Sequence, residues 1–253
     1  MDKLNKIVDN RKWYHSSKPL QVFDTRLKDI LSLEVEAIAS KLPDLVKIEA
    51  RKQYLVMLVT CFETYLRDMF KIMIDDELIQ TNKLFELEIF KKIKFSFDEI
   101  EFIQKNSIKF SELLSEYINF QNFEIVLKIF SLIGLNDKID SMHNKKDDIV
   151  PLPDSKIFES MGLPKGSLVK GEELAITLLK QFILHKKSIS RKVMYADIKL
   201  LLSLRHKIVH HNVSIEINQD DLIRLTLAIY GFVMSLESIY QEMVNSKKPI
   251  TAS

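Results

Sequence analysis

The sequence predicts an all-α protein that folds as a helical bundle, and three observations support this prediction. Apolar residues recur at three- and four-residue steps over long stretches, which is the period of an amphipathic helix. Glycine and proline are scarce, at 5 Gly and 6 Pro in 253 residues, which disfavours a many-stranded sheet and a glycine-rich phosphate loop. Apolar residues make up 46% and charged residues 28%, a composition typical of a folded domain rather than a disordered chain.

Two long helices are predicted in the first third of the chain, on either side of Pro43. The first runs from Gln21 to Lys41, where apolar residues follow helical spacing at Phe23, Leu27, Ile30, Leu31 and Val35. The second runs from about residue 44 to residue 80, with one continuous apolar stripe through Leu55, Leu58, Phe62, Tyr65, Met69 and Met73. Its length and its stripe predict the central helix of the core.

The middle of the chain is less regular. Short apolar groups separated by polar breaks predict short helices over residues 81–134. Residues 135–171 are predicted to be loop-like, because half of the prolines and three of the five glycines lie there: Pro151, Pro153, Pro164, Gly162, Gly166 and Gly171.

Helical periodicity returns in the last third of the chain. One helix is predicted over residues 172–185, and a second from Ser190, its expected N-cap, to residue 208. A third begins after Asn218, its expected cap, and has acidic residues in its first turn, where the helix dipole favours carboxylates. Its heptad-like stripe consists of Leu222, Leu225, Ile229, Phe232, Leu236, Ile239 and Met243.

The length and the single cysteine limit the architecture and the compartment. One domain, with or without an inserted subdomain, is expected from 253 residues. Cys61, the only cysteine, excludes an intramolecular disulfide and any zinc site that needs two thiolates, and we expect it to be a small core residue. Residues 1–13 lack a signal-peptide pattern, and no segment supplies about 18 uninterrupted apolar residues. We therefore expect a cytoplasmic protein with no membrane partner.

The net charge is only +2, but basic residues concentrate between residues 186 and 207. This segment has one acid, Asp197, against seven basic residues: Lys186, Lys187, Arg191, Lys192, Lys199, Arg205 and Lys207. Such a local excess attracts phosphate through Coulomb steering and counterion release. The solvated face of a lysine-rich helix explains the charge equally well.

An arginine and three histidines cluster at the end of an apolar helix, within residues 200–212. Arg205 falls on the same predicted helix face as an apolar stripe made of Met194, Ile198, Leu201 and Ile208. Burying an unpaired guanidinium is costly. Arg205 is therefore expected to pair with a carboxylate of a neighbouring helix, to line a solvated groove or to bind an anionic ligand.

His210 lies five residues after Arg205, a step that turns it by about 140° around an ideal helix. The two side chains converge only if the helix ends or loosens near Val209, or if two copies of the motif meet across a dimer interface. His206 and His210 are four residues apart, as two ligands of one metal can be, but no glutamate follows His206 and no nearby cysteine or carboxylate completes a ligand set. No metal and no other cofactor is expected.

These residues carry a resemblance to a known family. Arg205, the polar His206, three further residues and His210, at the end of the third long helix of an α bundle, resemble the motif of the HEPN superfamily. The segment Cys61-Phe-Glu-Thr-Tyr-Leu-Arg-Asp68 of the central helix is similar to the first core helix in several of its families. The resemblance implies a HEPN-like core bundle over residues 47–80 and 171–245 of a single domain, with an additional N-terminal helix and an irregular helical insertion over residues 81–170.

The resemblance also implies a homodimer whose two motifs face one cleft, and a metal-independent endoribonuclease of a toxin or phage-defence system. His210 would be general base or acid at the ribose 2′-hydroxyl, and Arg205 would stabilise charge on the phosphate. The products would carry 2′,3′-cyclic phosphate and 5′-hydroxyl ends. His206 would orient the site or contact the substrate. A basic set would hold the RNA backbone without reading its sequence: Lys207, Lys186, Lys187, Arg191 and Lys192.

Two other interpretations stay open. In a catalytically inactive HEPN-like binding or regulatory module, Arg205 and His210 would stabilise the fold or bind a ligand. In a regulatory or assembly protein, the apolar stripe of the last helix would be a partner surface, although such a stripe is usually core. An antitoxin or a sensor protein is a further partner that the resemblance implies.

Overall fold

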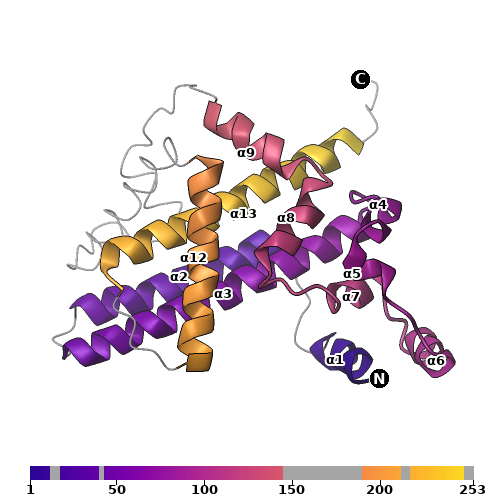
Figure 1. Cartoon of the computed structure of the whole chain (residues 1–253), viewed down its shortest axis with the longest axis horizontal. Helices are drawn as coiled ribbons and strands as arrows, with labels where there is room; N and C mark the ends of the chain where they lie inside the picture. The colour runs from indigo at the N-terminus through magenta and orange to yellow at the C-terminus, as the bar shows by residue number, and fades with distance from the viewer. Residues whose placement is uncertain (12–17, 40–42, 145–189, 212–216, 248–253) are drawn as a thin grey trace. The chain divides into compact units, whose positions relative to one another are not determined.

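The computed structural model describes residues 1–11, 18–39, 43–144, 190–211 and 217–247, and every regular element in these ranges is an α-helix (Figure 1). The predicted all-α class is therefore confirmed. The helices are, in chain order, α1 (Asp2–Arg11), α2 (Pro19–Ala39), α3 (Asp44–Asp75), α4 (Thr81–Phe85), α5 (Glu88–Lys91), α6 (Phe97–Lys105), α7 (Phe110–Ser115), α8 (Phe123–Ser131), α9 (Leu135–Asn144), α12 (Arg191–His211) and α13 (Gln219–Lys247).

The chain divides into two compact units. Unit 1 comprises Met1–Arg26, Val59–Lys138 and Phe232–Ser253, and unit 2 comprises Leu27–Leu58 and Ile139–Gly231. The long helices α2, α3 and α13 contribute residues to both units. The prediction of one domain, with a core at 47–80 and 171–245 and an insertion at 81–170, stays a prediction.

The two long helices predicted around Pro43 are confirmed as α2 and α3. α2 begins at Pro19, a residue well suited to the first helical position because its missing N–H has no helical partner to bond there. α3 ends five residues earlier than predicted, because Glu77 adopts a left-handed backbone with φ of 55°. The Leu78 N–H donates to the Met73 carbonyl at 2.8 Å and the Glu77 N–H to the Ile74 carbonyl at 3.0 Å, which completes a Schellman motif.

Aromatic side chains form the core of unit 1. Phe62 of α3 and Phe123 of α8 both pack on Phe232 of α13, with ring centroids 5.6 and 5.5 Å apart. Phe23 of α2 and Tyr65 of α3 pack with centroids 5.5 Å apart. All five residues are buried, so these contacts join four segments that are distant in the sequence.

Cys61 occupies this core, as predicted. Its side chain is buried and its Sγ lies 3.7 Å from the carbonyl oxygen of Phe23. Burial raises the pKa of Cys61 to about 12, so the thiol stays protonated and unreactive at neutral pH.

The short helices predicted over residues 81–134 are confirmed as α4 to α8. The loop predicted from residue 135 is wrong at its start, because α9 forms there. Gly134, with φ of 78°, supplies the left-handed turn between α8 and α9, and the Lys138 N–H bonds its carbonyl at 3.0 Å. The remainder of that predicted loop and the predicted helix over 172–185 lie outside the described residues.

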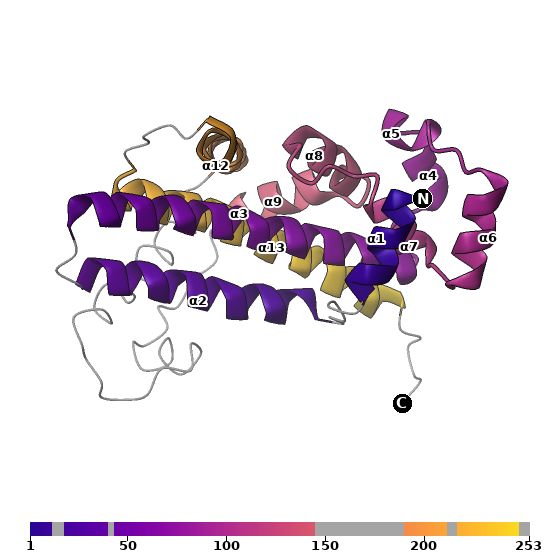
Figure 2. The ribbon, with the colours of Figure 1, turned by 90° about the horizontal axis from the view of Figure 1, so that it is seen from below.

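Helix α1, which was not predicted, packs on α6 and α7 (Figures 1 and 2). Leu4 and Ile7 of α1 are buried in one apolar cluster with Ile108 and Leu113. At the end of α1, Arg11 donates to the carbonyls of Asn106 and Ser107, both at 2.8 Å, and forms a two-pronged ion pair with Glu112. The N-terminal segment is therefore an integral part of unit 1.

In unit 2, the 27–39 part of α2 runs alongside the 44–58 part of α3, and α12 crosses them steeply (Figures 1 and 2). The predicted caps are confirmed, since the Ser190 hydroxyl accepts from the Val193 N–H at 3.4 Å and the Asn218 side chain from the Asp221 N–H at 2.8 Å. α12 also lies close to Gly231 of α13, where an added Cβ would stand 3.4 Å from Met194.

Of the described helices, one is long and apolar enough to cross a membrane by length and composition alone. It is the Asp220–Lys247 part of α13, and 61% of its most apolar window is buried inside the structure. Core helices of soluble proteins have the same two properties, so this observation is weak evidence for a membrane span. The absence of a membrane partner stays a prediction.

Candidate functional site

Helix α12 carries the arginine–histidine motif, and its apolar stripe determines how the motif is presented. Met194, Ile198 and Leu201 are buried, as the predicted stripe requires. Arg205, one turn further along, is half-buried and its Nε atom is shielded from solvent. The guanidinium therefore starts at the edge of the core rather than in open solvent.

Val209 lies inside helix α12, in which the backbone is helical from Arg191 to His211. α12 continues to His211, so Arg205 and His210 are separated by five residues of continuous helix and by a rotation of about 140°. Arg205 is half-buried, whereas His210 is exposed. In the described residues the helix does not loosen between Arg205 and His210, so the first of the two predicted routes to convergence is not seen there.

The three histidines form an exposed cluster at the end of α12. The ring centroids of His206 and His210 lie 4.6 Å apart and those of His206 and His211 lie 5.6 Å apart. His206 thus contacts both of the other imidazoles. Sequence reasoning assigned roles to His206 and His210 and missed His211, although its place next to His210 at a helix end was a usable signal.

No metal centre is visible in the part of the chain that the structure describes, where no three His, Cys, Asp or Glu side chains gather closely enough to hold an ion. Two imidazoles alone make an incomplete ligand set. The expectation that the protein uses no cofactor stays a prediction.

The predicted basic set is only partly described. Lys207 and Lys192 are exposed on α12. The Nη1 atom of Arg191 lies 2.7 Å from the Asp140 carboxylate, so a phosphate would have to compete with that ion pair. Lys186 and Lys187 lie outside the described residues. Contact of this set with RNA stays a prediction.

A buried carboxylate holds α12 against α13. Asp197 is only 5% exposed, and its Oδ1 atom lies 3.6 Å from Nε of Arg224, which also pairs with Asp221 at 3.2 Å. Burial raises the pKa of Asp197, the charge of Arg224 lowers it, and the negative charge of Asp221 raises it again, with a net upward shift. Asp197 lies two turns before Arg205, so this contact helps to fix the helix that carries the motif.

Comparison with known families places these residues in a wider context. The family model described as RiboL-PSP-HEPN matches residues 22–242, which include most of α2, all of α3 and α12, and the motif. Comparison with the curated proteins and with the solved structures finds no match.

Proposed function

The chain belongs to the RiboL-PSP-HEPN family, within the HEPN superfamily, and we propose that it is an endoribonuclease that cleaves RNA without a metal ion. Family membership supports a role in RNA cleavage or nucleotide binding. The observation that carries the finer proposal is the exposed cluster of three imidazoles on α12, one turn from a half-buried arginine.

Each residue has a chemical role in this proposal. His210 removes the proton of the ribose 2′-hydroxyl, whose oxygen then attacks the adjacent phosphorus. The bond from phosphorus to the 5′-oxygen breaks, and that oxygen takes up a proton from an imidazolium. The products are a 2′,3′-cyclic phosphate and a 5′-hydroxyl. Arg205 neutralises the charge that builds up on the non-bridging oxygens. His206, 4.6 Å from His210, holds the His210 ring in position.

A complete site requires two copies of the chain in this proposal. Because α12 is continuous through His211, Arg205 and His210 of one chain face directions that differ by about 140°. In a symmetric dimer, Arg205 of one protomer can meet His210 of the other across a shared cleft. Lys207 and Lys192, both exposed on α12, would then hold the RNA backbone beside that cleft.

The biological setting follows from the same resemblance. We propose a cytoplasmic enzyme of a toxin or phage-defence system, whose activity an antitoxin or sensor protein restrains. The catalytically inactive module is the alternative that the experiment below distinguishes.

The experiment is cleavage of a mixed RNA pool in excess EDTA, with end-group analysis of the fragments. We expect the wild type to produce cyclic-phosphate ends and His210→Ala to produce none above background. His143→Ala, which alters a histidine outside the motif in α9, is the matched control and should cleave like the wild type. A folded dimeric wild type that cuts no RNA would favour the inactive module, and equal cleavage by His210→Ala would show that the site is wrong.

A further inference from the structure

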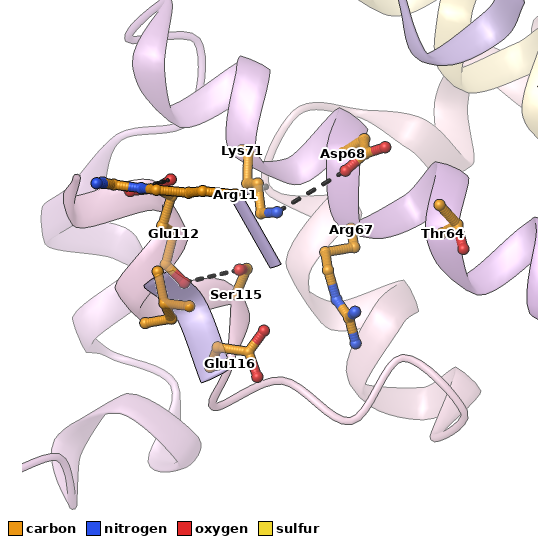
Figure 3. Close-up of a pocket in the computed structure, with 9 residues that line it drawn as sticks. Arg11, Thr64, Arg67, Asp68, Lys71, Glu112, Ser115 and Glu116 are labelled. Atoms are coloured by element: carbon orange, nitrogen blue, oxygen red, sulfur yellow. Dashed lines mark hydrogen bonds and ion pairs between the residues drawn. The ribbon is translucent and has the colours of Figure 1, made fainter. Parts of the chain in front are cut away.

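A polar cavity lies in unit 1, lined by α1, α3 and α7 (Figure 3). Four of its lining residues come from α3 at positions i, i+3, i+4 and i+7, which share one face of a helix. They are Thr64, Arg67, Asp68 and Lys71. They form a polar stripe on a helix that also supplies buried core residues such as Leu66 and Phe70. None of them belongs to the arginine–histidine motif of α12.

Every carboxylate that lines this cavity already has a cation. Glu112 accepts from Nε of Arg11 at 2.7 Å and makes a second contact with the same guanidinium. Glu116 lies 3.3 Å from Nζ of Lys6. Asp68 lies 3.8 Å from Nζ of Lys71, and Figure 3 shows that pair on the α3 side of the cavity. Each of these carboxylates thus has an ion-pair partner other than Arg67, which acts on Asp68 only through its charge at longer range.

Arg67 is the surplus charge. Its Nε atom is buried and has no hydrogen-bond partner among the residues that the structure describes. Its guanidinium carbon lies 5.8 Å from the centroid of the Phe120 ring, a cation–π contact that supplies no acceptor for the Nε hydrogen. A buried donor without an acceptor costs free energy that an acceptor would recover.

We propose that this cavity binds the phosphate group of a small molecule, with Arg67 as the principal ligand and Lys71 as the second. The planar fork of a guanidinium matches two phosphate oxygens, and an ammonium adds a point charge. The cavity volume of about 80 Å³ suits a phosphate-sized anion, so that any group attached to the phosphate stays outside. The ligand is thus inorganic phosphate or a mononucleotide bound through its phosphate.

Calorimetric titration of the full chain tests this. The chain carries His210→Ala, so that the result does not depend on ribonuclease activity. Inorganic phosphate, AMP and adenosine are the probes. We expect phosphate and AMP to bind and adenosine not to bind. Tighter binding of AMP than of phosphate would identify the nucleotide as the ligand, and equal affinities would identify the phosphate alone.

Two variants and one control assign the site. Arg67→Gln should weaken AMP and phosphate binding at least tenfold, and Arg67→Lys should weaken it less, because it retains the charge but loses the fork. Lys83→Gln, an exposed lysine of α4 outside the cavity, is the matched control and should bind like the parent. Circular dichroism checks that each variant is folded. If Arg67→Gln fails to fold, the affinity of Arg67→Lys for phosphate and AMP tests the proposal in its place.

Three results would overturn the proposal. The first is that neither phosphate nor AMP binds to the folded parent chain. The second is that a folded Arg67 variant binds both as tightly as the parent does. The third is that adenosine binds as tightly as AMP, which would show that the phosphate is not recognised. A failure of the ribonuclease proposal would leave these titrations unaffected.

Discussion

The hydroxyl of Tyr54 donates a hydrogen bond to the hydroxyl oxygen of Thr226 across 2.7 Å in the core of unit 2. The direction follows from a second bond, since Thr226 gives its own hydrogen to the Leu222 carbonyl at 2.7 Å. Both side chains are buried. This pair therefore joins α3 to α13 in the unit that also contains the arginine–histidine motif.

Removing either hydroxyl should destabilise the protein, but by different amounts. Tyr54→Phe removes the donor and should lower the free energy of unfolding by about 1 kcal/mol. Thr226→Val removes two hydrogen bonds, the one accepted from Tyr54 and the one donated to the Leu222 carbonyl, and should cost more, about 2 kcal/mol. Urea denaturation of the two variants gives both values. The reverse order would show that the donor is wrongly assigned.

The proposed dimer predicts complementation between two inactive variants. Arg205→Ala and His210→Ala should each be inactive alone. In a heterodimer, one composite site pairs the intact Arg205 of one chain with the intact His210 of the other. A one-to-one mixture, unfolded and refolded together, should recover about a quarter of wild-type activity, because about half of the dimers are mixed and each has one working site of two. A mixture that stays inactive while forming mixed dimers would contradict composite sites.

The Arg11–Glu112 pair predicts a pH-dependent contribution to stability. Burial raises the pKa of Glu112, but the hydrogen bond from Arg11, the N–H of Lys109 and the nearby positive charges outweigh it and lower the pKa overall. A carboxyl group whose pKa is lowered by folding stabilises the protein above its unfolded pKa, and the contribution is lost as pH falls through the lowered folded value.

Glu112→Gln should therefore reduce the free energy of unfolding by about 1–2 kcal/mol at about pH 7, and by much less at about pH 3. Urea denaturation at the two pH values measures the difference. Glu101→Gln, an exposed glutamate of α6, is the control and should have little effect at either pH. A loss that is the same at both values would mean that the ionised carboxylate is not the stabilising form.

Asp197 should behave in the opposite way. Its pKa is raised by burial, so folding disfavours its charged form. Its contribution to stability is most favourable below the unfolded pKa and declines as pH rises through the raised folded value. Asp197→Asn should therefore gain stability relative to the wild type between about pH 4 and about pH 7. Thermal unfolding across this range tests the prediction. If the wild type instead becomes more stable than the variant as pH rises, the Arg224 contact outweighs the cost of burying the charge.

The end of α3 offers a stabilising substitution. Glu77 has a φ of 55°, which costs an L-residue conformational energy that glycine does not pay. Glu77→Gly should raise the free energy of unfolding by about 0.5–1 kcal/mol, because the backbone bonds of the Schellman motif are retained. Chemical denaturation measures the change. The opposite substitution, Gly134→Ala, places a Cβ at φ of 78° and should destabilise the protein.

Much of the fold could be predicted because apolar spacing and capping residues are local signals. The stripes of α3, α12 and α13, and the caps Ser190 and Asn218, need only a few neighbouring residues to be recognised. Helices α1 and α9 were missed because their packing supplies the deciding interactions. α1 is held in place by the ion pair of its own Arg11 and by apolar contacts with Ile108 and Leu113. Both kinds of contact are made with residues about 100 positions further along the chain.

The candidate site was predictable in its residues but not in its geometry. The residues Arg205, His206 and His210 could be identified from the sequence, together with the rotation of about 140° that an unbroken helix would place between Arg205 and His210. Whether the helix breaks near Val209 depends on packing and capping that no local pattern gives. The role of Arg67 could not be predicted either. It follows only from the structure, in which the carboxylates around Arg67 are paired with other cations.

The ion pair that anchors α1 also constrains how the chain is assembled during synthesis. Arg11 and Glu112 are 101 residues apart, and at roughly 5–20 residues per second the partner of Arg11 is made about 5–20 s later. Throughout that interval Leu4 and Ile7 have nothing to pack against from α6 or α7. Helix α1 therefore waits for α6 and α7 to be made before it reaches its native contacts, and until then its apolar face lacks the side chains that bury it in the folded protein.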